Sequence, residues 1–151
     1  AMQMTEAGAD LIIGTHPHVV QPITWIEAAN GNRSLCYYSL GNYVSTQKNA
    51  KSMLGGLAWV TFHVTADGIS IAEEYTGVVP LVCHYSSSPV RLKNVYLLEN
   101  YTESLAQSHG IISYGSVAFH LDSLRKWCDE ILGSWVLSTE KINQRYCEPP
   151  E

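Results

Sequence analysis

The chain has 151 residues and a formal net charge of −5, with 46% hydrophobic and only 15% charged residues. This composition predicts a folded globular chain, and the length fits one domain. The negative charge and the lack of any run of Lys and Arg argue against a nucleic-acid-binding protein. The sequence shows no signal peptide, and no apolar window reaches the roughly 18 residues of a membrane span.

Residues 1–7 are predicted to form the last turns of a helix that ends at Gly8, because glycine favours the position just after a helix C-terminus. Residues 9–13 follow as a short apolar strand, which is typical of a parallel sheet. The helix has no N-terminal capping residue, so we expect the chain to begin inside a structural element, as part of an α/β unit.

Two histidines follow this strand in the motif Gly14-Thr15-His16-Pro17-His18. Pro17 favours an extended conformation for His16, and alternate side chains of an extended segment point the same way. We therefore expect His16 and His18 to converge on one metal centre, since neutral imidazole is a common ligand of zinc and related ions. A His-x-His pair is also frequent by chance. It lacks a nearby carboxylate here, because Asp10 lies on the other side of the strand.

The middle of the chain is predicted to form antiparallel strands joined by the turn signals Asn30-Gly31 and Asp67-Gly68. A second glycine turn is expected at Leu40-Gly41-Asn42, and the polar residues 46–52 are expected to form a mobile loop. The predicted strands span residues 23–26, 34–39, 57–64 and 69–79.

From Pro80 onward we expect a separate region with short strands at residues 82–85 and 92–98. Thr102 is predicted to cap a short helix over residues 103–109, and apolar residues at helical spacing predict a second helix over 121–132 that ends at Gly133. The pattern then fades, and the Pro149-Pro150 end is expected to be loose. The expected division of the chain is 1–80, 81–133 and a weakly structured tail, 134–151.

Four cysteines are scattered without a C-x-x-C pair, which argues against a zinc ribbon or a dense disulfide framework. Three of them lie in apolar runs and are expected to be buried thiols, whereas the fourth lies in the polar tail and is expected to be exposed. The three are Cys36, Cys83 and Cys128, and the fourth is Cys147.

The remaining histidines carry weaker signals. His63 and His120 are interpreted as structural residues, and His109 as a surface residue near a helix C-terminus, where its charge is favoured. His84 lies in an apolar strand, where a histidine is usually a core residue, but it could reach the same end of the sheets as the histidine pair.

Several segments closely resemble the bacterial poly-gamma-glutamate capsule synthesis (CapA-like) proteins. The two most specific are a signature around the histidine pair, GADLIIGTHPHVVQP, and a second one, YSLGNYV, at the expected distance from it. The resemblance covers roughly residues 1–132. The matching segments are residues 8–22, 38–44, 55–57, 80–85 and 101–105.

The resemblance implies the fold and site of the calcineurin-like metallophosphoesterase superfamily. The expected fold class is α/β (α+β): the C-terminal half of a four-layer sandwich, with a mixed sheet, antiparallel hairpins and C-terminal helices. The superfamily motif Gly-x-His-x-His implies that His16 and His18 are catalytic metal ligands, one for each of two divalent ions of the Mn, Fe or Zn type. Asn42 and His84 are weaker candidates for contacting substrate. Asn42 could instead hold a ligand, orient Ser39, or simply tolerate a left-handed turn.

The superfamily's other metal motifs, of the Asp-x-His, Gly-Asp-x-x-Asp and Gly-Asn-His types, do not occur in this sequence. We therefore expect a C-terminal portion of a longer protein, with weak or no metal binding and no activity by itself. Its expected partners are the N-terminal half of its own domain, a second copy through strand exchange, and a polymer or phosphoester substrate. The resemblance implies a bacterial cell-envelope or extracellular location, membrane-anchored in the full-length protein, with this portion soluble.

Two functions remain open. The first is a metal-dependent hydrolase of capsule or cell-envelope polymer biosynthesis, in which two metals activate a water and a histidine protonates the leaving group. The second is a non-catalytic module that binds or assembles polymer on the same fold. The metal content of the whole domain would separate them. An amidohydrolase barrel of ~250 residues, which also uses His-x-His, is excluded by the length and the hairpins.

Overall fold

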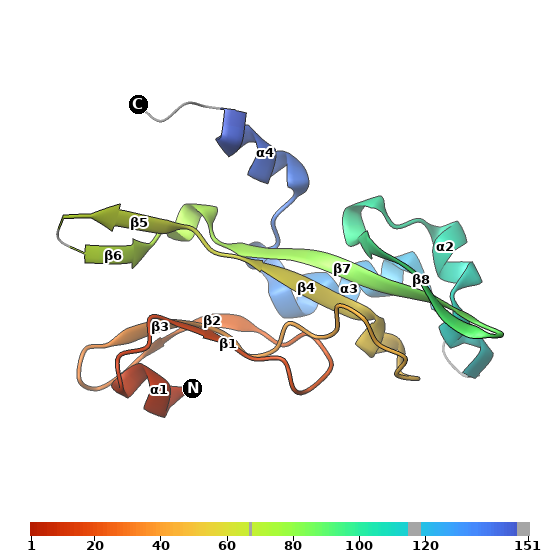
Figure 1. The fold of residues 1–151 in the computed structure, drawn as a ribbon, viewed down its shortest axis with the longest axis horizontal. Coiled ribbons are helices and arrows are strands. Elements are labelled where there is room, and N and C mark those ends of the chain that lie inside the picture. The colour runs from red at the N-terminus through yellow and green to blue at the C-terminus, as the bar shows by residue number, and fades with distance from the viewer. Residues whose placement is uncertain (67, 115–118, 148–151) are drawn as a thin grey trace.

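The computed structural model describes residues 1–66, 68–114 and 119–147, and no helix among them is long and apolar enough to cross a membrane. The chain has a mixed α/β fold with mostly antiparallel strands and C-terminal helices, as predicted. Figure 1 shows an elongated arrangement in which the N-terminal sheet lies below a longer central sheet. The α-helices are α1 (Met2–Glu6), α2 (Glu103–Ser108), α3 (Leu121–Leu132) and α4 (Thr139–Cys147).

The N-terminal sheet has the order β1-β3-β2, and β1 runs parallel to β3 as predicted. Strand β2 pairs antiparallel with β3 through the expected hairpin, whose turn places Gly31 at φ 88°. Helix α1 ends before Gly8, at φ 93°, which confirms the predicted helix stop. The strands are β1 (Leu11–Ile13), β2 (Ile23–Glu27) and β3 (Arg33–Tyr37).

The central sheet has the order β4-β7-β8, with β4 (Leu54–Trp59), β7 (Gly77–Ser87) and β8 (Val90–Leu97). Strand β7 is buried over its first nine residues and pairs with a neighbour on each side. The start of a separate region, expected at Pro80, falls inside β7, where Pro80 lies opposite Gly56. The chain therefore crosses this position without leaving the sheet.

The two long strands predicted at 57–64 and 69–79 are wrong, because each is interrupted. The chain leaves the central sheet after β4, forms a separate hairpin, and returns to the sheet only at β7. The hairpin consists of β5 (Phe62–Thr65) and β6 (Gly68–Ile71), and Val64 on it is 75% exposed. The apolar alternation of β5 therefore does not face the core. The turn residue Asp67 lies outside the described residues.

One hydrophobic core joins the two larger sheets to the C-terminal helices. Leu35 and Tyr37 of the N-terminal sheet pack in the same cluster as Val82 of β7 and Leu124 of α3. The loop expected to be mobile at 46–52 is wrong in its second half, because residues 50–52 belong to a 3₁₀ turn, η1 (Ala50–Met53), in which Ala50 and Ser52 are buried. Met53, the last residue of η1, lies in the hydrophobic core, and the polar residues before it gave no sign of this.

The C-terminal region confirms the helix predictions and corrects the tail. Thr102 caps α2 by accepting a hydrogen bond from the Leu105 amide at 3.2 Å, and α3 ends before Gly133, at φ 51°. The tail is not weakly structured up to residue 147. The Leu137 amide donates to the Val78 carbonyl at 2.9 Å, and α4 follows. Residues 148–151, which include Pro149 and Pro150, lie outside the described residues.

Candidate metal centre

The histidine motif begins where β1 ends, and the close approach of two backbones fixes that position. The Gly14 amide donates to the Tyr37 carbonyl at 2.8 Å. A Cβ atom on Gly14 would lie only 2.2 Å from the Tyr38 carbonyl oxygen, so only glycine fits. The strand end and the glycine together direct the next residues away from the sheet.

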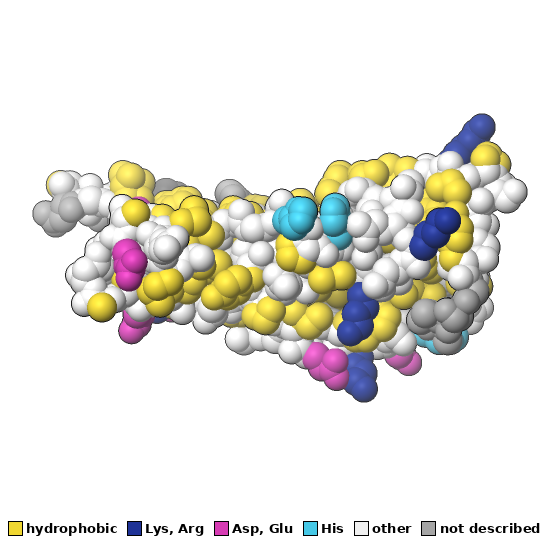
Figure 2. Space-filling view, turned by 90° about the horizontal axis from the view of Figure 1, so that it is seen from below, with side chains coloured by type: hydrophobic (Ala, Val, Ile, Leu, Met, Phe, Trp, Pro, Cys, Tyr) yellow, Lys and Arg dark blue, Asp and Glu magenta, His cyan; other side chains and the backbone are white. Residues whose placement is uncertain are grey.

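The rings of His16 and His18 lie next to each other, with their centroids 6.2 Å apart and their planes at 48°. The expectation that an extended segment aligns them is wrong, because the chain turns at His16-Pro17 and His18 lies at φ 59°. This left-handed conformation is uncommon outside glycine. Both residues are exposed, and Figure 2 shows two histidine side chains side by side on one face, with hydrophobic groups beside them.

Asn42 of the second motif is the residue that holds His18. Its Oδ1 lies 2.8 Å from His18 Nδ1, and its Nδ2 donates to the His18 carbonyl at 3.0 Å and to the Ser52 carbonyl at 3.1 Å. Its exposure is only 7%. The Ser39 hydroxyl accepts from the Gly41 amide instead of contacting the Asn42 side chain, so Asn42 orients His18 and not Ser39.

Two more glycines allow Asn42 to reach this place. Gly41 lies at φ 67°, and a Cβ atom on it would lie 2.7 Å from the Leu54 carbonyl oxygen. A Cβ atom on Gly55 would lie 2.1 Å from the Asn42 carbonyl oxygen. The segments around 14–18, 41–42 and 55–56, separate in the sequence, therefore meet at one site.

His84 lies elsewhere, in a buried cluster of rings. Its Nδ1 is 2.7 Å from the Tyr101 hydroxyl, and its ring contacts those of Tyr96 and His109. Burial, with a smaller contribution from Lys93, lowers the pKa of His84 below its usual value. The described contacts do not bring it to the histidine pair, and a role in binding substrate stays a prediction.

His109 was expected at the surface, and this is wrong. It is 2% exposed, its Nε2 bonds to the Cys83 carbonyl at 2.9 Å, and its Nδ1 accepts from the Ile111 amide at 2.9 Å. The helix ends one residue earlier than expected and turns back to β7, which buries the ring. His63 and His120 are exposed, near Glu74 and Glu103 respectively.

Residues 1–47 match the protein family described as "Bacterial capsule synthesis protein PGA_cap". The chain is also 37% identical over 92 residues to the "PGA biosynthesis protein CapA" of Bacillus subtilis (strain 168). It is 36% identical over 81 residues to the "Capsule biosynthesis protein CapA" of Bacillus anthracis. The chain is therefore similar to these CapA proteins over part of its length. These matches take in 60% and 54% of this chain but only 21% and 17% of the relatives, and no solved structure matches it significantly.

The described residues provide two neighbouring histidines but no complete ligand set. Among the described residues, no group of three or more His, Cys, Asp or Glu side chains is placed to hold a metal ion. Asp10, before β1, lines a different cavity with Trp25 and Arg33. The donor chemistry of the site therefore fits two imidazole ligands and no more.

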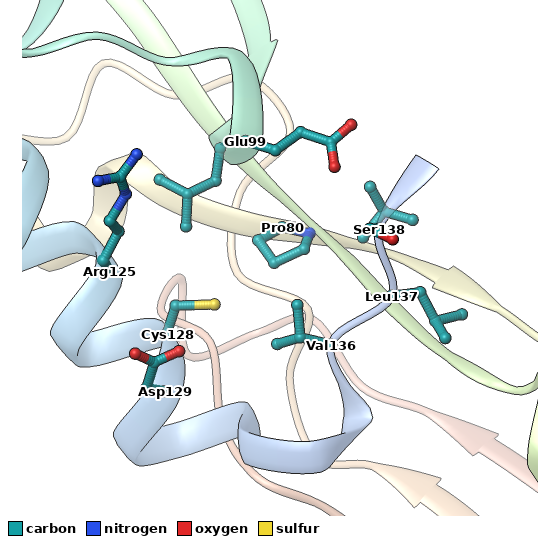
Figure 3. A pocket seen from close by; sticks show the side chains of 10 residues that line it. Pro80, Glu99, Arg125, Cys128, Asp129, Val136, Leu137 and Ser138 are labelled. Atoms are coloured by element: carbon teal, nitrogen blue, oxygen red, sulfur yellow. The ribbon is translucent and has the colours of Figure 1, made fainter. Parts of the chain in front are cut away.

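Sequence reasoning missed a cavity of about 270 Å³ that lies between Pro80 of β7, helix α3 and the segment that follows α3. Figure 3 shows Arg125, Cys128 and Asp129 of α3 around it, opposite Val136. Burial raises the pKa of the Cys128 thiol to about 11, so the thiol stays protonated. Cys36 and Cys83 are buried free thiols as well, as predicted, while the side chain of Cys147 lies outside the described ones.

Proposed function

We propose that this chain supplies two imidazole ligands, His16 and His18, to a divalent metal centre of a hydrolase that acts in capsule polymer biosynthesis. The observation that supports this is the pair of exposed rings 6.2 Å apart at the end of a parallel strand, a place where ligand sites often form in α/β sheets. A bound ion of the Zn, Mn or Fe type would activate a water and stabilise charge on the reacting oxygens.

The proposed reaction class is hydrolysis of a phosphoester or of a bond in the capsule polymer, as in calcineurin-like metallophosphoesterases. The names of the relatives from the two Bacillus species support a role in capsule and PGA biosynthesis. The sequence resemblance around Gly14 to His18 supports the hydrolytic chemistry. A cell-envelope location follows from the same proposal.

The remaining ligands are proposed to come from residues outside this chain, which spans about a fifth of the length of the curated relatives it matches. Apolar side chains near the histidine loop support a docking surface for that part: Ile13, Tyr38, Tyr43 and Val44 are between 45% and 60% exposed. Exposed apolar groups gathered beside a polar site are typical of an interface. By itself this chain is expected to bind zinc weakly and to hydrolyse nothing.

Zinc titration of the chain, followed by the ring signals of the histidines in NMR spectra, tests the proposal. His16 and His18 should shift first, and His16→Ala or His18→Ala should weaken zinc binding by about tenfold or more, at least the loss caused by removing an outer-shell partner. The matched controls are His63→Ala and His120→Ala. These two histidines are also exposed, but they lie beside Glu74 and Glu103. Equal zinc affinity in all four variants would overturn the metal site.

The second test uses the longer polypeptide that we propose. With its remaining ligands present, it should hydrolyse bis-p-nitrophenyl phosphate, and His18→Ala should abolish this activity. If the longer polypeptide binds no metal at His16 and His18, the enzyme is excluded and the non-catalytic polymer-binding module takes its place.

A further inference from the structure

We propose that Asn42 is a positioning residue that makes Nε2 of His18 the metal-binding atom. This inference rests on the proposed metal centre but concerns a property of the metal-free chain. The two ring nitrogens of a neutral histidine are not equivalent, because one carries a proton and only the other has a free lone pair. The partner of one nitrogen therefore decides which nitrogen can bind a metal.

The hydrogen bonds of Asn42 fix the orientation of its amide. The two groups on one side of it, the carbonyls of His18 and Ser52 at 3.0 Å and 3.1 Å, can only accept hydrogen bonds. The amide nitrogen must face them, since a flipped amide would set its oxygen against two carbonyl oxygens. Oδ1 therefore faces the His18 ring.

The orientation of the amide then determines the proton position on the ring. Asn42 Oδ1 can only accept, so the His18 Nδ1 atom 2.8 Å away must be the donor. In the neutral ring the proton is on Nδ1, and the lone pair is on Nε2, at the far side of the ring from Asn42. The side chain that holds the ring thus leaves the outward nitrogen free.

Asn42 also holds the backbone of His18. The bond from Nδ2 to the His18 carbonyl supports a residue at φ 59°, a conformation that residues other than glycine rarely adopt. The Ser52 carbonyl ties the same amide to the buried turn η1. By contrast, the His16 ring has no hydrogen-bond partner among the described residues, so one histidine of the pair is fixed and the other is free to turn.

The test is long-range ¹H–¹⁵N NMR on the metal-free protein with labelled histidine at pH 8. His18 should carry its proton on Nδ1, whereas His16 should show the Nε2–H form that free imidazole side chains prefer. In Asn42→Ala the His18 signal should change to the His16 type. In Asn42→Asp, whose carboxylate keeps an acceptor for the ring but no longer donates to the carbonyls of His18 and Ser52, the Nδ1 proton should remain.

The matched control is Asn49→Ala, which removes the asparagine that caps η1 through its bond to the Lys51 amide and leaves Asn42 in place. Its His18 proton should stay on Nδ1. Zinc affinity should fall roughly 10–100-fold in Asn42→Ala. Should Asn42→Ala fail to fold, the wild-type spectrum decides: a proton on Nε2 of His18 overturns the role of Asn42. A proton on Nδ1 without any zinc binding, either in this chain or in the longer polypeptide, upholds the effect of Asn42 on the ring and overturns the proposed function.

Discussion

Lowering the pH from 7 to 5 should destabilise the fold through His109. Burial is the main cause that lowers the pKa of this ring to about 4, from an ordinary 6.5, and the neighbouring His84 acts in the same direction. Between these two values the unfolded chain takes up a proton that the folded chain does not. Stability is therefore complete above pH 6.5 and falls as the pH drops toward 4.

The magnitude follows from the two pKa values. With 6.5 unfolded and about 4 folded, the free energy of unfolding should be lower at pH 5 than at pH 7 by about 2 kcal/mol, and the loss approaches about 3 kcal/mol at lower pH. Protonation would also break the bond that Nδ1 accepts from the Ile111 amide, because a protonated ring cannot accept there. The rings of His84, Tyr85 and Phe119 surround it within 4.8 Å, and no carboxylate is among these contacts.

Urea unfolding at pH 7 and pH 5 measures the effect in wild type and in His109→Gln. Wild type should lose about 2 kcal/mol more than the variant over this range, and the exposed-site control His63→Gln should behave like wild type. A direct NMR titration of the His109 ring provides the check that does not depend on a variant. An apparent pKa near 6.5, or an equal loss of stability in wild type and His109→Gln, would refute the reasoning.

Three further changes have definite expected outcomes. Gly55→Ala places a Cβ atom 2.1 Å from the Asn42 carbonyl oxygen. It should therefore lower the free energy of unfolding in urea by roughly 1–3 kcal/mol and weaken zinc binding. The control Gly31→Ala, where nothing lies within 4 Å, should leave zinc affinity unchanged. The Cys128 thiol, buried and with its pKa raised to about 11, should react with iodoacetamide only in denaturant, as followed by peptide mass spectrometry; rapid labelling of the folded chain would contradict this. Val64→Thr, on a side chain 75% exposed, should change stability by less than about 0.5 kcal/mol; a larger loss would mean that the β5–β6 hairpin packs against something.

Local signals in the sequence predicted the elements that local chemistry controls. The turn at Asn30-Gly31, the cap at Thr102 and the helix stop at Gly133 are all present, because each depends on the conformational preference of one or two residues. The parallel pairing of β1 was also predictable, since a continuous apolar run is typical of parallel strands, although Ile13 at the end of this one is exposed.

Features that depend on distant contacts could not be predicted in the same way. The alternation of residues 57–64 is correct for a strand, yet the chain leaves the sheet in the middle, and no local residue signals the interruption. His109 follows a helix, where a charged surface ring is common, but the next residues fold back onto Cys83 and bury it. For His109 the contact with β7 determines the result.

The same difference between local signals and distant contacts applies to the candidate site. His16 and His18 could be identified from sequence, but the reason for their proximity could not, because it depends on a left-handed His18 held by Asn42, 24 residues away. The parts that orient the ring all lie within this chain. Its orientation should therefore persist even where the affinity for metal is low, and the two properties can be measured separately in the same sample.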